Sequence, residues 1–208
     1  MAYQMTAGTS SRVSQFTLRG STSPPVAREP LETGGFGAVA EAADLRFVRL
    51  GGVELVRRLY CAVRDPNWGT LPPVSLETIV AREHGSARLD WQASFVEAGI
   101  SVEAHGEHEL RADRTLRSTF VGEARSDFLY NRIGLCLLLP PGEFAGQPFV
   151  ASGARGTTEG TLPERIGPQR IVDGLPAPLF PAFARLELHG RSGARLEIDF
   201  EGDLFELE

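Results

Sequence analysis

The sequence predicts a mainly β protein: an antiparallel two-layer β-sandwich, of the large type found in carbohydrate-active enzymes, with long Gly/Pro-rich loops. Two observations support this fold class. From Leu45 onward, apolar and polar residues alternate with a period of two, and short turns separate the alternating runs. No convincing long helix interrupts these runs, so we expect antiparallel strands at short spacing.

The composition excludes several kinds of partner and chemistry. A net charge of −6 and a pI near 5.3 argue against nucleic acid and anionic membranes, which require a basic face. All 21 cationic Lys/Arg side chains are arginine, which excludes Schiff-base and phosphate-loop lysines. No apolar stretch is long enough for a signal peptide or a membrane span, so we expect a cytoplasmic location.

Residues 1–43 are rich in Ser, Thr, Gly, Pro and Ala, and we predict a flexible N-terminal arm with a short strand at Val13–Leu18. Within the arm, Gly35–Ala40 matches the relaxed dinucleotide pattern G-x-G-x-x-A. No strand of a βαβ unit precedes it, so we interpret it as a loop. Residues 44–208 are assigned to the β-sandwich domain. Because Glu201–Glu208 keeps an apolar, strand-like character, we expect this domain to be the N-terminal part of a longer chain.

The first half of the domain contains three clear patterns. Val53–Val63 fits both a strand and a helical stripe, and its alternating neighbours favour the strand. Asp65–Gly69 marks a loop, and Ala87–Phe95 is a half-buried strand. A hairpin follows, in which Leu110 opposite Leu116 also places Glu109 opposite Arg117.

The second half contains the longest apolar run. Ile133–Leu139 is apolar on both faces, which predicts a central strand covered on each side. Eight prolines between Pro140 and Pro181 exclude a regular central sheet there, so we expect short strands at Pro148–Ala151 and Thr158–Leu162. In a final hairpin, Leu188 opposite Ala194 would also pair Glu187 with Arg195 and Arg185 with Glu197.

Histidine and cysteine give no metal pattern. His105 and His108 lie three positions apart, so on a strand they point to opposite faces, and we interpret both as surface side chains. His84 and His189 are expected in a loop and on an outer face. Cys61 and Cys136 lie in apolar runs and are predicted to be buried, reduced thiols. We expect no metal and no cofactor.

One polar set combines carboxylates with an arginine, a combination that orients sugar hydroxyls or carboxylates or serves in acid–base chemistry. Two readings stay open: a substrate rim, or an ion-pair network that fixes loops or a domain interface. The candidates are Asn131, Arg132, Glu159, Glu164, Glu201, Asp203 and Glu206.

The same region resembles the N-terminal domain of the D-apionate lactonase family. The resemblance rests on short blocks in a fixed order and covers about Leu45 to Glu208. Leu139 stands where the family pattern has a histidine, so no histidine role is carried over. The blocks are Arg57–Tyr60, Ala62–Asp65, Asn67–Thr70, Asn131–Cys136, Pro140-Pro141, Ala145–Pro148, Glu159–Glu164 and Phe200–Glu206.

The resemblance implies a bacterial enzyme of carbohydrate metabolism that hydrolyses D-apionolactone to D-apionate. Family members are longer and continue into a region that looks like a (β/α)-barrel, whose active site would lie at the C-terminal ends of its strands. By this reading the substrate is a sugar-acid lactone, the partner is a neighbouring barrel of the same chain, and the catalytic residues lie elsewhere. The isolated chain would then be an inactive part of a carboxylic-ester hydrolase.

Two other functions remain open from the residues alone. The domain could be a non-catalytic carbohydrate-binding module, which needs flat aromatic platforms for sugar rings. Trp68, Trp91, Phe144 and Phe149 are the candidate platforms, although the alternation points Trp91 into the predicted core. It could also be a docking module that only holds a neighbouring domain.

Overall fold

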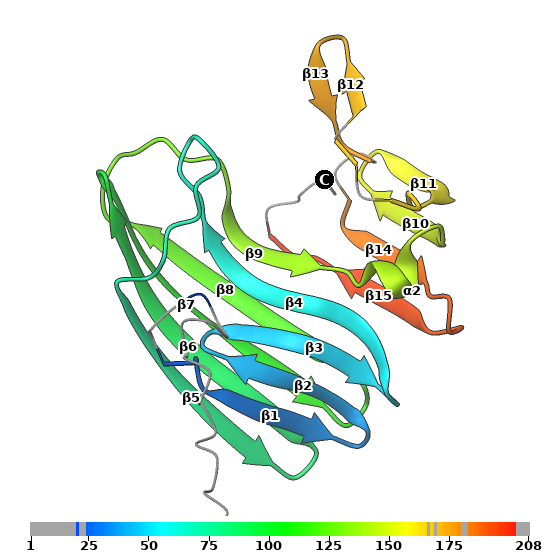
Figure 1. The fold of residues 1–208 in the computed structure, drawn as a ribbon, viewed down its shortest axis with the longest axis horizontal. Coiled ribbons are helices and arrows are strands. Elements are labelled where there is room, and N and C mark those ends of the chain that lie inside the picture. The colour runs from blue at the N-terminus through cyan, green and yellow to red at the C-terminus, as the bar shows by residue number, and fades with distance from the viewer. Residues whose placement is uncertain (1–19, 21–23, 166, 169, 180–182, 203–208) are drawn as a thin grey trace, which may run out of the picture.

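The computed structural model describes residues 20, 24–165, 167–168, 170–179 and 183–202. Its larger part is a two-layer sandwich of antiparallel sheets, which confirms the predicted fold class (Figure 1). The first sheet, in the order β1-β2-β3-β4-β9, consists of β1 (Arg28–Thr33), β2 (Phe36–Glu41), β3 (Asp44–Leu50), β4 (Val53–Val63) and β9 (Ile133–Leu138). The second, in the order β5-β6-β7-β8, consists of β5 (Ser75–Glu83), β6 (Ser86–Glu97), β7 (Ile100–Arg111) and β8 (Leu116–Ala124).

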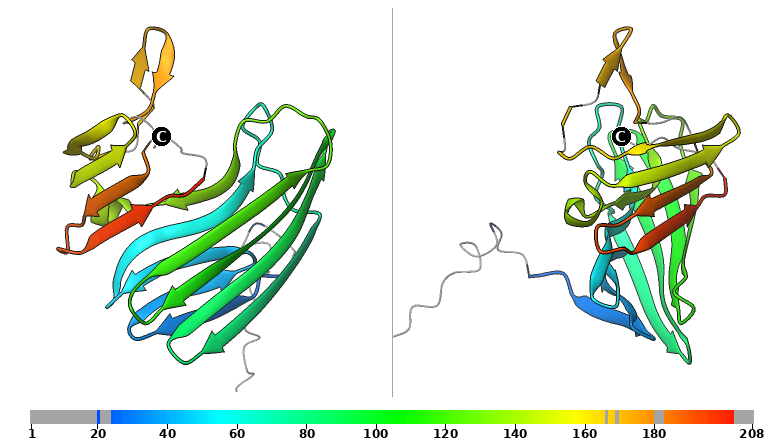
Figure 2. Two further views of the ribbon diagram at one scale, coloured as in Figure 1. Left: turned by 180° about the vertical axis from the view of Figure 1, so that it is seen from behind. Right: turned by 90° about the vertical axis from the view of Figure 1, so that its right-hand side faces the viewer.

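The core lies between these two sheets, which stack face to face in Figure 2. Successive side chains of a strand point to opposite faces, so every second residue is available for burial. In β6 the inward set follows the predicted alternation and is at most 4% exposed: Ala87, Leu89, Trp91, Ala93 and Phe95. The outer faces of both sheets carry the charged residues.

The prediction of an arm over residues 1–43 is wrong for residues 28–41, which form the hairpin of β1 and β2. Gly34 and Gly35 connect the strands with φ of +56° and +80°, the positive values that a two-residue hairpin turn requires. Phe36 and Leu31 are buried in the core. Half of the residues of β2 are alanine or glycine, which made its alternation weak in the sequence. Val13–Leu18 lies outside the described residues.

The apolar run Ile133–Leu139 is not a central strand, because β9 lies at the edge of its sheet and pairs only with β4. Its side chains serve two different cores instead. Leu135 and Leu137 pack into the sandwich, whereas Leu139 packs into a second cluster that belongs to a smaller sheet. Because residues of this run pack into two separate cores, nearly all of them are apolar, as they would be in a strand buried on both faces.

The smaller sheet follows β9 and has the order β11-β10-β14-β15. It consists of β10 (Pro148–Gly153), β11 (Gly156–Thr161), β14 (Arg185–His189) and β15 (Arg195–Asp199), so the two predicted short strands are present. A short helix, α2 (Pro141–Phe144), precedes it, and β12 (Arg170–Val172) pairs with β13 (Leu175–Ala177). Leu55 of β4 joins its core, which attaches the smaller sheet to the sandwich. No helix of the described residues could span a bilayer.

The two predicted hairpin registers have different outcomes. In β7–β8, Leu110 pairs with Leu116 and Glu109 with Arg117, as predicted. In β14–β15 the register differs by two residues, because Leu188 pairs with Leu196. A three-residue turn ends at Gly193 with φ +85°, and this turn sets the shift. A shift of two keeps the inward face, and the predicted ion pairs of Arg195 with Glu187 and of Arg185 with Glu197 still form diagonally.

His108 is a core residue, which corrects its interpretation as a surface side chain. The two histidines do point to opposite faces: His105 is exposed, whereas His108 is 0% exposed and has Nδ1 2.9 Å from the Ser118 hydroxyl. Burial lowers the pKa of His108 to about 4, although the backbone of Ala43 acts to raise it. The alternation that points Leu110 inward points His108 inward too, so the pattern already held this information.

Candidate functional site

The outer face of β4 carries a line of polar side chains toward the end of the strand. Arg58, Tyr60 and Arg64 share this face because they are two or four positions apart. Arg58 donates to Asp44 Oδ2 at 2.7 Å, and its guanidinium carbon lies 4.0 Å from the Tyr60 ring centre. On the neighbouring strand, Cys136 is the partner of Tyr60. This line leads to the loop that follows β4.

That loop is organised by Asp65. Its Oδ1 accepts hydrogen bonds from the backbone N–H groups of Asn67 and Gly69, both at 2.8 Å. Such a local carboxylate turn is typical of Asp-Pro-Asn sequences. A Cβ on Gly69 would lie 2.6 Å from Asp65 Oδ2, so the close approach requires glycine. The hydrogen bonds to Asp65 therefore hold the loop in one conformation.

The loop presents Trp68 in a strained conformation. Its φ is +70°, a value that costs a bulky residue on the order of 1–3 kcal/mol. Its side chain is 47% exposed although it is the most apolar residue of the loop. Neither feature helps a folded core, and strain of this kind gathers at functional sites. Trp68 is therefore the first component of the candidate site.

Two arginines flank the Trp68 ring. The guanidinium carbons of Arg64 and Arg132 lie 5.4 and 5.7 Å from the ring centre, within the range of cation–π contacts. The backbone fixes both positions, because the Arg64 N–H donates to the Arg132 carbonyl and the Asn131 N–H donates to the Arg64 carbonyl. These bonds extend the β4–β9 pairing beyond the strands. Arg64, Trp68, Asn131 and Arg132 together form what we call the tryptophan site.

The guanidinium of Arg64 has neutral partners. Its Nη2 lies 3.2 Å from the Tyr60 hydroxyl and 3.8 Å from Cys136 Sγ. Within the part of the chain that the structure describes, Arg64 forms no ion pair. The side chain is half-buried, so its charge is only partly screened by water. The side-chain oxygen of Asn131 is buried and has no hydrogen-bond partner among the described residues.

A recess of about 470 Å³ adjoins this line of residues, between the turn at residues 41–44 and the loop at residues 70–73. Asp44, Arg58, Tyr60, Cys61 and Trp91 contribute to its lining. Burial raises the pKa of Asp44, and Arg58 opposes this effect. Burial also raises the pKa of the Cys61 thiol to about 12, so the thiol is not an activated nucleophile at neutral pH. Both cysteines are free and half-buried.

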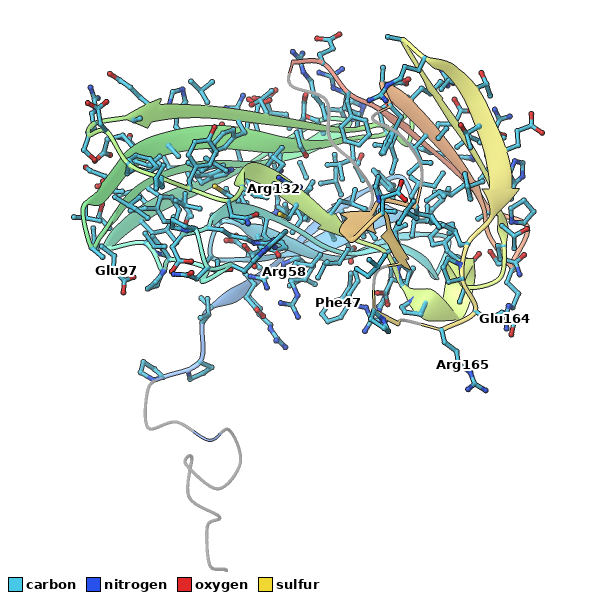
Figure 3. All side chains as sticks on the ribbon, turned by 90° about the horizontal axis from the view of Figure 1, so that it is seen from above. Phe47, Arg58, Glu97, Arg132, Glu164 and Arg165 are labelled. Carbon is cyan, nitrogen blue, oxygen red and sulfur yellow. The ribbon has the colours of Figure 1, made fainter. Side chains whose placement is uncertain are left out.

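The predicted polar set does not converge on one place. Asn131 and Arg132 lie together at the tryptophan site, whereas Glu164 lies with the smaller sheet, far from Arg132 in Figure 3. Glu159 is exposed on β11, where it pairs with Val150, and Glu201 is exposed after β15. Asp203 and Glu206 lie outside the described residues. Of the five candidates that the structure describes, Asn131 and Arg132 are the two that lie at the tryptophan site.

Sequence reasoning missed Arg64 and misjudged two aromatic platforms, Phe144 and Phe149, whereas the alternation had already placed Trp91 in the core. Trp91, Phe144 and Phe149 are 4%, 1% and 5% exposed, so they are core residues and cannot receive a sugar face. Trp68 is the platform candidate that remains. The available signal for Arg64 was its place in the even-numbered face of β4, next to the Asp-Pro-Asn-Trp-Gly turn. Among the described residues, no group of three or more His, Cys, Asp or Glu side chains is arranged as metal ligands.

The arrangement suits binding rather than bond cleavage. Arginine stays protonated and cannot act as a general base, and tryptophan has no acid–base function. A guanidinium with neutral partners attracts an anion, and an exposed indole covers an apolar face. The fold and the site thus define a β-sandwich domain that presents an aromatic, cationic binding surface.

Comparison with known proteins identifies the family. Residues 16–208 match the D-apionate lactonase N-terminal domain, and the chain belongs to this family. The match begins before Leu45, so part of the predicted arm takes part in it. The chain is 26% identical over 206 residues to a D-apionate lactonase from Brucella anthropi, which covers 95% of this chain. It spans about a third (32%) of the length of that relative. No solved structure matches the chain.

Proposed function

We propose that this chain is the N-terminal β domain of a sugar-acid lactone hydrolase that converts D-apionolactone to D-apionate. The observation that carries this proposal is the family match over residues 16–208, together with the name of the relative from Brucella anthropi. The same resemblance supports a role in bacterial carbohydrate metabolism, in the cytoplasm.

We also propose that the hydrolytic chemistry lies outside these 208 residues, in a downstream barrel. Two observations support this view. The matched part is 32% of the relative's length, which leaves room there for a further domain. The candidate site combines Trp68 with arginines, an asparagine and a tyrosine. Among the described residues, the Arg64 guanidinium donates to the neutral Tyr60 hydroxyl and Cys136 thiol and to no carboxylate. Such a set can orient a substrate but supplies no base.

The predicted polar residues then divide into two proposed roles. Asn131 and Arg132 contribute to the substrate rim, because Arg132 lies beside the exposed Trp68 ring and the Asn131 backbone N–H donates to the Arg64 carbonyl. Glu159, Glu164 and Glu201 are exposed on or near the smaller sheet, which suits contacts with a neighbouring domain. We assign Asp203 and Glu206 to the same interface on the basis of the resemblance.

The test begins with the intact mass of the native protein, followed by an assay of D-apionolactone opening by the native protein and by residues 1–208. We expect a mass several times 22.5 kDa, turnover by the native protein and none by residues 1–208. In the native protein, Arg132→Ala should lower turnover or thermal stability. Equal turnover by residues 1–208 would place the chemistry in this domain. No turnover by the native protein would overturn the lactonase proposal.

One observation favours a second candidate function, a non-catalytic carbohydrate-binding module. Trp68 is 47% exposed on a loop of fixed conformation, as a sugar platform must be. A native mass near 22.5 kDa with no lactone turnover would favour this candidate. Calorimetric titration with oligosaccharides would then be decisive, and the absence of heat with every ligand would exclude it.

A further inference from the structure

Among the residues that the structure describes, the Arg64 guanidinium forms no ion pair with a carboxylate. Its side chain is half-buried on the outer face, and its hydrogen-bond partners are the neutral Tyr60 hydroxyl and Cys136 thiol. Arginines elsewhere on this sheet differ, since Arg28, Arg49, Arg57 and Arg58 each form an ion pair with a carboxylate of the chain. A fixed guanidinium without a carboxylate is a ready binding partner for the carboxylate of a ligand.

Trp68 adds an apolar face to this charge. The ring is 47% exposed, and the Arg64 guanidinium carbon lies 5.4 Å from its centre. A carboxylate held by Arg64 would therefore place the rest of a small ligand over or beside the indole. Sugars and their acids present C–H groups on one face, which pack well on an aromatic ring.

Asn131 adds a hydrogen-bond acceptor. Its side-chain oxygen is buried and without a partner among the described residues, and its backbone N–H donates to the Arg64 carbonyl at 3.1 Å. An orphaned buried acceptor is costly unless a ligand or water donates to it. Hydroxyl groups of a polyhydroxy acid are such donors.

We propose that Arg64, Trp68 and Asn131 bind an open-chain sugar acid, the hydrolysis product, in preference to the uncharged lactone. The guanidinium of Arg64 binds the carboxylate, the Trp68 ring packs on the C–H face, and the Asn131 oxygen accepts from a hydroxyl. The guanidinium carbon of Arg132 lies 5.7 Å from the centre of the same ring and borders the site. The choice of a sugar acid rests on the proposed function, whereas the preference for an anion rests on Arg64. This surface is then a product site that responds to the accumulation of acid.

The test is calorimetric titration of the native protein with D-apionate and D-gluconate, with the neutral sugar D-apiose and with acetate. Because a hydrogen bond to a charged group is worth at least a tenfold change in affinity, we expect both acids to bind about 10-fold more tightly than D-apiose. Acetate, which lacks the apolar face and the hydroxyls, should bind more weakly than either acid. Equal affinity for acid and neutral sugar would overturn the proposal.

Two variants and one control assign the effect. R64Q should remove the preference for acids, and W68A should weaken every ligand of the panel. R57Q is the matched control, since Arg57 also lies beside an aromatic ring but is paired with Glu54, and it should leave binding unchanged. Loss of binding in R57Q, or retained preference in R64Q with an unchanged melting curve, would contradict the assignment. If R64Q fails to fold, W68A on the exposed loop still tests the site.

The outcomes separate this inference from the proposed function. Lactone turnover without any acid binding would overturn the product site and leave the lactonase proposal intact. Acid binding without lactone turnover by the native protein would support the acid-binding site and overturn the lactonase proposal.

Discussion

Two clusters on the outer face of the sheet formed by β1–β4 and β9 each contain an aromatic residue at positive φ with arginines beside it. They differ in the ion pairs that these arginines form. In one, Trp68 has φ +70° and lies near two arginines. In the other, Phe47 has φ +54° and lies near Arg46, Arg49 and Arg57, at 5.5 to 5.7 Å. Phe47 is labelled in Figure 3. It lies in β3 where the pairing with β2 is interrupted by a β-bulge. Arg57 in β4 and Arg64 just after it are seven positions apart, roughly 23 Å along an extended chain.

Carboxylates account for the difference. Glu54 forms ion pairs with Arg49 and Arg57, and Glu41 lies 3.6 Å from Arg46. Both carboxylates are only 18% exposed, so they lie beneath the guanidiniums and neutralise them. Arg64 has no such partner among the described residues. The arginines of the Phe47 cluster are therefore paired with carboxylates of the chain, whereas Arg64 has only neutral side-chain hydrogen-bond partners among the described residues.

The largest expected effect is a loss of stability at low pH caused by the buried His108. It sets the pH range in which binding at the two clusters can be compared. The pKa of His108 is about 4 in the fold and 6.5 unperturbed, so between these values the unfolded chain binds the extra proton. The free energy of unfolding is therefore highest above pH 6.5 and decreases as the pH falls toward 4. Between pH 7 and pH 5 we expect a loss of about 2 kcal/mol in the free energy of unfolding.

Urea titrations at several pH values measure this loss, with H108Q and H105Q compared. H105Q alters an exposed residue of the same strand and should keep the wild-type slope, whereas H108Q should flatten it. Equal slopes for all three proteins would mean that His108 does not remain neutral in the fold.

A second prediction breaks the tryptophan site without touching a charge. Gly69→Ala places a Cβ 2.6 Å from Asp65 Oδ2 and displaces the turn that holds Trp68. We expect sugar-acid affinity to fall about 10-fold, or about 1.4 kcal/mol, with the sandwich still folded. Calorimetry measures the affinity and circular dichroism the fold. Gly142→Ala is the control, because nothing lies within 4 Å of its Cβ, and binding should not change.

A third prediction converts one cluster toward the other. Glu54→Gln removes the carboxylate beneath Arg49 and Arg57, so the Phe47 cluster should gain weak binding of sugar acids as a second site in calorimetry. Because these are partly exposed ion pairs, stability should change by less than about 0.5 kcal/mol. A variant that binds acids only as the wild type does would show that unpaired arginines beside a ring are not sufficient.

Local patterns in the sequence predicted local structure well. The bounds of β4 and the β7–β8 register follow from alternation and from charge pairs that are close along the chain. The β14–β15 register was wrong because a turn conformation at Gly193, not side-chain pairing, sets it. The edge position of β9 could not be predicted. An apolar run is expected both for a central strand that is buried on its two faces and for an edge strand whose residues pack into two separate cores.

The candidate site depended on long-range pairing. The sequence marked Asp65–Gly69 as a loop, Trp68 as an aromatic platform and Asn131 and Arg132 as polar candidates. It could not place them together, because the β4–β9 pairing that aligns Arg64 with Arg132 joins segments about 70 residues apart. The missing charge partner of Arg64 is also a property of the fold, since it depends on which carboxylates the fold brings near.

The indole N–H signals of Trp68 and Trp91 in the ¹⁵N-labelled protein test the central claim most directly. Trp68 is exposed at the site and Trp91 is 4% exposed in the core, so the pair provides a site signal and an internal reference. On addition of D-apionate, the Trp68 signal should move in a saturable way, and the Trp91 signal should stay. D-apiose at the same concentration should move the Trp68 signal much less and leave the Trp91 signal in place. A Trp68 signal that ignores D-apionate, or responds equally to D-apiose, would contradict the account.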